Sequence, residues 1–317
     1  MKLAPPESPF DVFRRSLVST VALPALILGL VLALVAVGCA APTNEPVEGG
    51  EEDTEASYED RMATEHADDT AEPSPAAQQE PAMPVDEEEV TYAVLGDREI
   101  QGFFAQPQEV QGDVPGILVI HEWWGLNDNI RNMARRLAGE GYMALAVDLY
   151  GGESADTPEA ARELMQGTTE RTDELEENLR QAQDFLVRQG AVRSGVIGWC
   201  FGGGWSLRTG LLMPDQIQAV VIYYGRLITD PDELAALQAP VLGIFGEEDQ
   251  GIPVESVQEF ETALEDLGKD NAIAIFPGAD HAFANPSGER YQPEAAEKAW
   301  DLTQDFLRRH LQPGAPD

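Results

Sequence analysis

The sequence predicts an α/β domain with a doubly wound, mostly parallel sheet that carries helices on both faces. From residue 90 onward, apolar runs of strand length alternate with longer amphipathic stretches, which is typical of strands joined by crossover helices. Several of these runs are almost continuously apolar, as expected for parallel strands buried on both faces. No internal repeat interrupts the pattern, so residues 90–317 are interpreted as one domain.

The elements of this domain follow from turn signals and apolar spacing, taken in chain order. The Gly96-Asp97 step separates two strands, at residues 90–94 and 100–106, and predicts an opening antiparallel pair. Further strands are expected at residues 116–120, 143–147, 192–198, 219–223, 241–245 and 272–276. Apolar positions with helical spacing predict helices at residues 127–138, 158–189 with a gap, 202–213, 253–267 and 293–311.

The charge balance excludes one broad class of partners. The 317 residues include 57 Asp and Glu against 20 Lys and Arg, a formal net charge of -37. Such a polyanion repels nucleic acid and acidic lipid surfaces, so no nucleic-acid partner is expected. The two cysteines, Cys39 and Cys200, are too few for a disulfide-stapled scaffold or a cysteine-rich metal site, and no metal or cofactor is predicted.

The first 38 residues are interpreted as a signal peptide. Arg14 and Arg15 precede an uncharged apolar run at residues 16–37, which ends in small residues before Cys39. This arrangement resembles a bacterial lipoprotein signal, in which the cysteine becomes the lipidated N-terminus. It implies lipidation at Cys39 and an exported, membrane-anchored protein on the periplasmic or cell-surface side. An uncleaved anchor is the alternative, because the run is about long enough to cross a bilayer.

Residues 39–89 are predicted to form a disordered acidic linker. Between Glu45 and Glu89 there are 17 acidic residues and one basic residue, Arg61, with few large apolar side chains. A stretch of this composition buries too little surface to offset the entropy of ordering. His66 lies in the stretch and is interpreted as a solvated residue.

The clearest chemical signature is the run Gly198-Trp199-Cys200-Phe201-Gly202-Gly203, between a predicted strand and a predicted helix. It has the form of a nucleophile elbow with cysteine at its centre. Glycines are needed there because the sharp turn leaves no room for bulky neighbours. The turn presents Cys200 at a helix N-terminus, where the dipole favours negative charge, and makes the N–H of Phe201 an oxyanion donor. A buried, inert cysteine is the structural alternative.

Two later segments supply partners for such a cysteine, in the chain order nucleophile, acid, histidine. Asp249 follows the strand predicted at residues 241–245 and is chosen as the acid over its neighbours Glu247 and Glu248. His281 follows the last predicted strand and can reach the same edge of the sheet. The three residue types in this order are much more specific than the elbow alone, and they indicate nucleophilic catalysis.

The domain closely resembles the dienelactone hydrolase family of α/β-hydrolases, from residue 90 to about residue 310. The resemblance rests on the elbow, on Asp249 and His281, on the run His121-Glu122-Trp123-Trp124-Gly125, and on shorter runs at residues 148–150 and 223–225. It implies the α/β-hydrolase fold. It also implies a hydrolase of small esters or lactones that forms an acyl-enzyme through Cys200, His281 and Asp249.

The resemblance assigns further roles near this triad. It implies that Glu122 contacts the resting thiol and that the N–H of Trp123 is the second oxyanion donor, beside that of Phe201. Zinc binding by His121 and Glu122 is not expected, because no second histidine follows at the HExxH spacing.

Four residues are candidates for substrate binding. Trp124 and Phe283 suggest an aromatic rim for the pocket. Arg162 and Arg290 are considered because the family clamps a substrate carboxylate with two arginines. The residue four positions after His281 is Asn285 rather than arginine, so dienelactone itself is not the expected substrate.

The sequence therefore predicts an exported, lipid-anchored, monomeric hydrolase of esters or lactones. The alternative is a surface lipoprotein that keeps the same fold for ligand binding and has lost turnover. Reactivity of Cys200 towards an alkylating agent would separate these two interpretations.

Overall fold

The computed structural model describes residues 58–67, 69, 80–109 and 112–312. The predicted signal peptide and Cys39 lie outside the described residues. Within the described ranges, no helix is long and apolar enough to cross a membrane.

A single sheet organises the described residues. Its strands are β1 (Val85–Leu95), β2 (Arg98–Pro107), β3 (Gly116–Ile120), β4 (Met143–Val147), β5 (Ser194–Trp199), β6 (Ala219–Tyr223), β7 (Val241–Gly246) and β8 (Asn271–Phe276). They lie in the order β1-β2-β4-β3-β5-β6-β7-β8. β1 and β2 form an antiparallel hairpin, β2 pairs antiparallel with β4, and the later pairs are parallel. The mostly parallel sheet is the predicted one.

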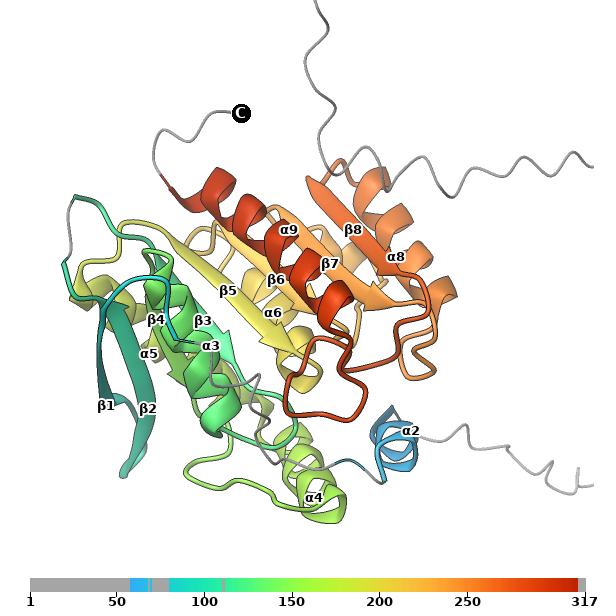
Figure 1. The fold of residues 1–317 in the computed structure, drawn as a ribbon, viewed down its shortest axis with the longest axis horizontal. Helices are drawn as coiled ribbons and strands as arrows, with labels where there is room; N and C mark the ends of the chain where they lie inside the picture. The colour runs from blue at the N-terminus through green and yellow to red at the C-terminus, as the bar shows by residue number, and fades with distance from the viewer. Residues whose placement is uncertain (1–57, 68, 70–79, 110–111, 313–317) are drawn as a thin grey trace, which may run out of the picture. The chain divides into compact units, whose positions relative to one another are not determined.

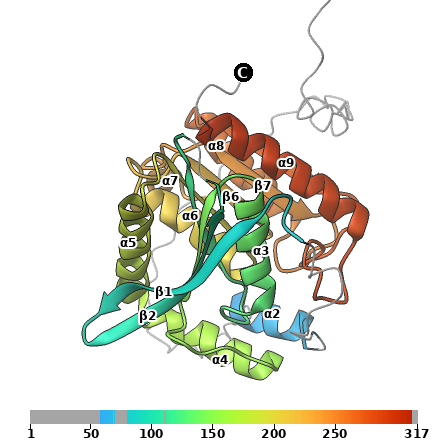
Figure 2. The ribbon, with the colours of Figure 1, turned by 60° about the vertical axis from the view of Figure 1, so that its left-hand side comes forward.

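Helices cover both faces of this sheet. They are α2 (Tyr58–Glu65), α3 (Asp128–Gly139), α4 (Pro158–Thr169), α5 (Thr172–Gln189), α6 (Phe201–Leu212), α7 (Pro231–Leu234), α8 (Val254–Asp266) and α9 (Pro293–Leu311). α3 and α9 lie on one face, and α5 and α6 lie on the other (Figure 1, Figure 2). The expected doubly wound α/β-hydrolase fold is confirmed.

The central strands are buried because they are apolar along almost their whole length; Ser194, at the start of β5, is buried with hydrogen-bond partners. Every residue of β3, β4, β5, β6 and β7 is buried. A charged side chain in the middle of such a strand would lose its water without gaining a partner. Residues that carry chemistry are therefore confined to the loops at the strand ends, where the parallel strands bring them to one edge of the sheet.

Apart from β1, the predicted strands and helices begin and end within two residues of the observed positions. β1 begins at Val85 rather than at residue 90, and includes acidic residues that we assigned to the linker. Glu87 and Glu89 form ion pairs with Arg135 and Arg131 of α3. These pairs explain how an acidic run forms an edge strand, and their partners are more than 40 residues away in sequence.

The interpretation of His66 as a solvated residue is wrong. α2 lies within the stretch expected to be a disordered linker, and the turn that follows it includes His66. Met62 and His66 are 1% and 2% exposed, respectively. The residues that bury them come from much later in the sequence, so the local composition contained no signal for this packing.

The start of α6 lies against the end of β3 with no room for a side chain between them. A Cβ atom on Gly202 would lie 2.4 Å from the carbonyl oxygen of Ile120 and 2.5 Å from that of His121. Backbone atoms cannot move aside as the end of a flexible side chain can. Glycine is therefore required at this position for the helix to approach the strand.

This contact leads to a stability prediction. Replacing Gly202 with alanine is expected to lower the free energy of unfolding by about 2 kcal/mol or more, because the new methyl group overlaps backbone atoms. Gly167→Ala in α4 is the control, since no atom lies within 4 Å of the added methyl group. It should raise stability by roughly 0.5–1 kcal/mol through helix propensity. Urea unfolding measures both, and equal effects of the two variants would contradict the argument.

Candidate active site

Cys200 lies in the turn between β5 and α6, at the carboxyl edge of the sheet. Its backbone has φ 54° and ψ -116°, a strained conformation for a residue with a side chain. Hydrogen bonds of 3.0 Å run from its N–H to the Tyr223 carbonyl and from the Gly203 N–H to its own carbonyl. Because Cys200 is the N-cap of α6, a negative charge on its sulfur is stabilised by the helix dipole. The expected elbow geometry is present.

The strand order explains why a crevice forms beside Cys200. β4 lies on one side of β3 and β5 lies on the other, so the connections after these strands diverge. Open α/β sheets bind ligands at such a point, beyond the carboxyl ends of the strands. Glu122 follows β3 and Cys200 follows β5, and both residues line one cavity.

Asp249 and His281 form a buried pair at the same edge. His281 Nδ1 lies 2.8 Å from Asp249 Oδ2, and the two side chains are 1% and 0% exposed. The other carboxylate oxygen of Asp249 accepts the Ile252 N–H at 2.8 Å. An ionised carboxylate only accepts hydrogen bonds, so His281 donates from Nδ1. Nε2 is buried in the cavity that it shares with Cys200, the group with which it can exchange a proton.

The charges of the site stabilise this pair. Burial disfavours a cation at His281, but the Asp249 carboxylate and, when it is a thiolate, Cys200 outweigh it and hold the pKa of His281 well above its ordinary value. Burial also disfavours the Asp249 carboxylate, but the charge and hydrogen bond of His281 outweigh it and lower the pKa of Asp249. The site therefore favours imidazolium beside carboxylate.

Two rings hold the His281 imidazole in place. The ring of Tyr224 lies with its centre 4.9 Å from that of His281, and the ring of His66 lies 4.7 Å away. His66 comes from the turn after α2, more than 200 residues earlier in the chain. A residue that we expected to be solvated is thus in contact with the predicted catalytic base.

Glu122 is buried beside amide groups rather than cations. Its Oε2 accepts hydrogen bonds from Asn285 Nδ2 at 2.8 Å and from Asn129 Nδ2 at 3.5 Å. Burial is the main influence and raises the pKa of Glu122 to about 7, although His281 and the two amides act in the opposite direction. This carboxyl group is therefore poised between its two protonation states near neutral pH.

His121 fixes the loop that carries Glu122. Its Nε2 accepts the N–H of Leu149 at 3.2 Å, so the ring proton is on Nδ1, which lies 2.5 Å from the Glu122 carbonyl oxygen and donates to it. The side chain is fully buried, and burial lowers its pKa. A neutral His121 thus connects the loop after β3 to the loop after β4.

The two predicted oxyanion donors lie on the loops that border Cys200. Phe201 is the first residue of α6, so its N–H has no acceptor within the helix. Trp123 follows Glu122 and is 3% exposed, with its ring 4.9 Å from that of Trp124. The strand ends therefore bring the two backbone amides and the sulfur into one region.

Two of the four predicted substrate-binding residues, Trp124 and Arg290, line the cavity at Cys200. Arg290 already has carboxylate partners there, because it pairs with Asp69 at 3.4 Å and with Asp280 at 3.3 Å.

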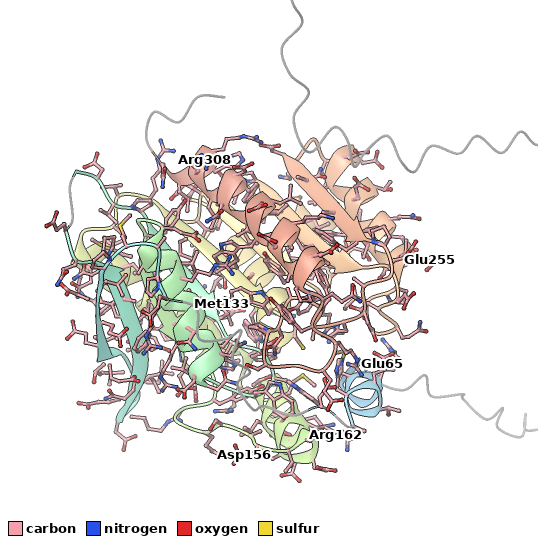
Figure 3. The ribbon with its side chains drawn as sticks, viewed as in Figure 1. Glu65, Met133, Asp156, Arg162, Glu255 and Arg308 are labelled. Carbon is pink, nitrogen blue, oxygen red and sulfur yellow. The ribbon has the colours of Figure 1, made fainter. Side chains whose placement is uncertain are left out.

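The expectation for Phe283 is wrong. Its side chain is fully buried and packs against Tyr224 and Phe276, with ring centres 5.7 and 5.1 Å away. It is a core residue beneath the site rather than part of the rim. Arg162, the fourth candidate, lies on α4 and is not among the described residues that line the cavity (Figure 3).

Sequence reasoning missed the roles of Asn129, Asn285 and His66. Asn285 was noted only for the arginine that it replaces, although an amide four residues after the histidine was a usable signal. Asn129 begins a helix close to Glu122 in sequence, so a contact between them could have been considered. The sequence contained no signal for His66.

Comparisons with known proteins agree with this geometry. Residues 100–311 match the dienelactone hydrolase family. A protein of Saccharolobus solfataricus, provisionally named a carboxymethylenebutenolidase, is 32% identical over 263 residues, which cover 70% of this chain and 98% of that protein. Protein usf of Aquifex pyrophilus is 33% identical, with 67% of this chain and 94% of that protein covered. The crystal structure of a provisionally named dienelactone hydrolase from Klebsiella pneumoniae has a TM-score of 0.64 at 27% identity, with 71% and 99% coverage.

The family match spans nearly the whole of the sheet and its helices, and the relatives are matched over almost their full length. The chain therefore belongs to the dienelactone hydrolase family, and it is a carboxylic ester or lactone hydrolase.

Proposed function

We propose that this hydrolase uses Cys200 as its nucleophile, His281 as its base and Asp249 as the carboxylate that orients the base. The observation that supports this most is the buried Asp249–His281 pair, 2.8 Å apart, at the same sheet edge as a cysteine with strained backbone. Strain of this kind persists where the surrounding structure enforces it, and it is concentrated at functional sites.

The proposed reaction has two halves. His281 Nε2 holds the proton that Cys200 has given up, so imidazolium and thiolate form an ion pair before the substrate binds, and the thiolate attacks the carbonyl carbon of the ester. The N–H groups of Phe201 and Trp123 stabilise the tetrahedral oxyanion. When this intermediate collapses, the leaving oxygen takes the proton from His281, and an acyl thioester remains on Cys200. Water, which His281 deprotonates, then attacks the thioester and releases the acid.

The surroundings of Glu122 bear on the substrate class. Asn285 donates its amide to Glu122, so this position offers no cation to a substrate carboxylate. Arg290 lines the cavity but is paired with two carboxylates of the chain itself. We therefore propose an ester or lactone without a carboxylate next to the reacting bond as the substrate, rather than dienelactone.

We also propose that the enzyme is exported and anchored by lipid at Cys39. The support is the sequence alone, in which arginines precede an apolar run that ends in small residues and a cysteine. The acidic stretch between Cys39 and the domain would then separate the enzyme from the membrane surface.

The nucleophile is tested by replacing Cys200 with alanine. We expect kcat/KM for a chromogenic ester to fall at least about a thousandfold, because the acyl-enzyme can no longer form. Cys39→Ala removes the other cysteine and should leave the rate of the purified protein unchanged. Mass spectrometry of the wild type under turnover should find the acyl group on the peptide that contains Cys200. Unchanged turnover in Cys200→Ala would exclude the proposed mechanism, and an inert wild type would favour a binding protein.

The protonation state of Glu122 is tested by measuring the stability of the folded protein as a function of pH. The carboxyl group of Glu122 has a pKa of about 7 in the folded protein and a pKa near 4.3 in the unfolded chain. As pH rises, the unfolded chain therefore loses this proton before the folded protein does. Glu122 therefore lowers the free energy of unfolding as pH rises from about 4.5 to about 7, by at most roughly 4 kcal/mol. Glu122→Gln should be more stable than the wild type above pH 7, and this advantage should vanish near pH 4.

Thermal unfolding across this pH range measures the difference. Glu99→Gln, at an exposed position on β2, is the control and should show a difference that does not change with pH. A constant difference for Glu122→Gln as well would mean that folding does not raise the pKa of Glu122.

The proposed export is tested on the mature N-terminus. Mass spectrometry of protein from membranes of a bacterial host should find Cys39 as the first residue, with attached acyl chains. Cys39→Ala should block this processing and leave the apolar run attached. An unmodified Met1 on the wild-type protein would exclude the lipoprotein proposal.

A further inference from the structure

A segment that precedes the catalytic domain lies over the catalytic residues. We call residues 58–67 and 69 the cap segment; it consists of α2 and the turn after it. α2 contacts α4, and Figure 3 shows Glu65 and Arg162 on these two neighbouring helices. In both ribbon views α2 also lies near the loop that joins β8 to α9, which carries His281 (Figure 1, Figure 2).

Met62 fixes the cap segment to the loop that carries Asp249. The Met62 side chain is 1% exposed, and its sulfur would lie only 2.6 Å from a Cβ atom on Gly251. The same Cβ would lie 3.4 Å from Asp249 Oδ1. Met62 therefore packs directly on the turn that carries the acid.

His66 covers the base itself. Its ring is 2% exposed, and its centre lies 4.7 Å from the ring of His281 and 5.7 Å from that of Trp123. His281 is the proposed base and Trp123 carries a proposed oxyanion donor. The ring of His66 thus lies above the two groups between which a reacting carbonyl has to enter.

Arg290 joins the cap segment to the loop after His281. Its guanidinium pairs with Asp69 and also contacts the His66 ring and the Glu65 carbonyl oxygen. Its Nε lies 3.3 Å from Asp280, the residue next to His281. Arg290 is therefore shared between the cap segment and the catalytic loop, and a bond of this ionic kind can be broken by water or by competing ions.

The closed cap leaves almost no space at the nucleophile. The cavity lined by Cys200, His281 and His66 has a volume of about 20 Å³, which is roughly the room that one water molecule requires. A larger cavity of about 390 Å³ is lined by Phe201 and Trp205 but not by Cys200. With the cap segment in place, the space beside the sulfur is therefore smaller than an ester or lactone.

We propose that the cap segment is an intramolecular gate, which closes the catalytic pocket and has to move away before a substrate reaches Cys200. The inference rests on the proposed function only in treating this pocket as the place of catalysis. The contacts that hold the gate include those of α2 with α4, the buried side chains of Met62 and His66, and the Arg290 contacts. A segment this short opens at a lower free-energy cost than the sheet beneath it.

The gate is tested by the access of a reagent to Cys200 in the full chain. Iodoacetamide labelling at neutral pH, quenched at intervals, is followed by mass spectrometry of the peptide that contains Cys200. Met62→Asp buries a carboxylate against the Asp249 loop, so it should expel the cap segment and raise the labelling rate about tenfold or more. Ala67→Asp adds the same charge at an exposed position of the cap segment and should leave the rate unchanged.

A second variant separates opening from a direct charge effect on the sulfur. Asp69→Lys introduces the opposite charge, repels Arg290 and should raise the labelling rate several-fold as well. If the added charges acted directly on the sulfur, Met62→Asp and Asp69→Lys would change the rate in opposite directions. If circular dichroism shows that Met62→Asp does not fold, Arg290→Gln takes its place, because opening of the cap segment predicts faster labelling whereas the lost positive charge by itself predicts slower labelling.

The result distinguishes the gate from the proposed catalytic mechanism, because labelling does not require turnover. Faster labelling in both variants supports the gate even if no ester is hydrolysed. If wild-type Cys200 is labelled as fast as in both variants, the cap segment does not restrict access and the inference is overturned. With chromogenic esters, kcat/KM should rise along with labelling if the catalytic proposal also holds.

Discussion

The close approach of the first turn of α6 to the end of β3 is the constraint on which the rest of the site depends. Gly202 packs on two backbone carbonyls at the end of β3, and no side chain fits between them. This contact forces the chain through a tight turn at Cys200, whose backbone is strained as a result. The same contact brings the loop that carries Glu122 and Trp123 beside the sulfur. The absence of a side chain at Gly202 therefore allows the packing that positions the nucleophile and both proposed oxyanion donors.

The pKa values of two buried carboxyl groups of this site are shifted in opposite directions, because their partners offset burial to different extents. Asp249 and Glu122 are both buried, and burial alone favours the protonated form of each. Asp249 faces an imidazolium at hydrogen-bond distance, which outweighs burial and keeps it ionised. Glu122 has the amides of Asn285 and Asn129 as its nearest partners, and these are too weak to do so. One buried region thus holds a permanent carboxylate beside a carboxyl group that titrates near neutral pH.

The cap segment links access to the site with its electrostatics. Its closure excludes water, and Asp69 adds a negative charge that contributes to the raised pKa of Glu122. The chain has 57 acidic and 20 basic residues, so carboxylates that can pair with Arg290 are abundant. It pairs with one from the cap segment and one from the catalytic loop, so it joins the two. Opening the cap segment would therefore hydrate the pocket and free Arg290 together.

The sequence by itself determined the fold class, the positions of most strands and helices, and the order of Cys200, Asp249 and His281 along the chain. These features are encoded locally, because apolar periodicity and turn glycines act within a few residues of where they occur. Only the tertiary structure decided that His66 packs on His281 and that Asn285 donates a hydrogen bond to Glu122. It also decided that Phe283 is a core residue, and that an acidic run forms a strand through ion pairs with α3. Each of these depends on partners from distant parts of the chain. The composition and spacing of the sequence around a residue do not identify such distant partners, because the partners meet only when the strands pair.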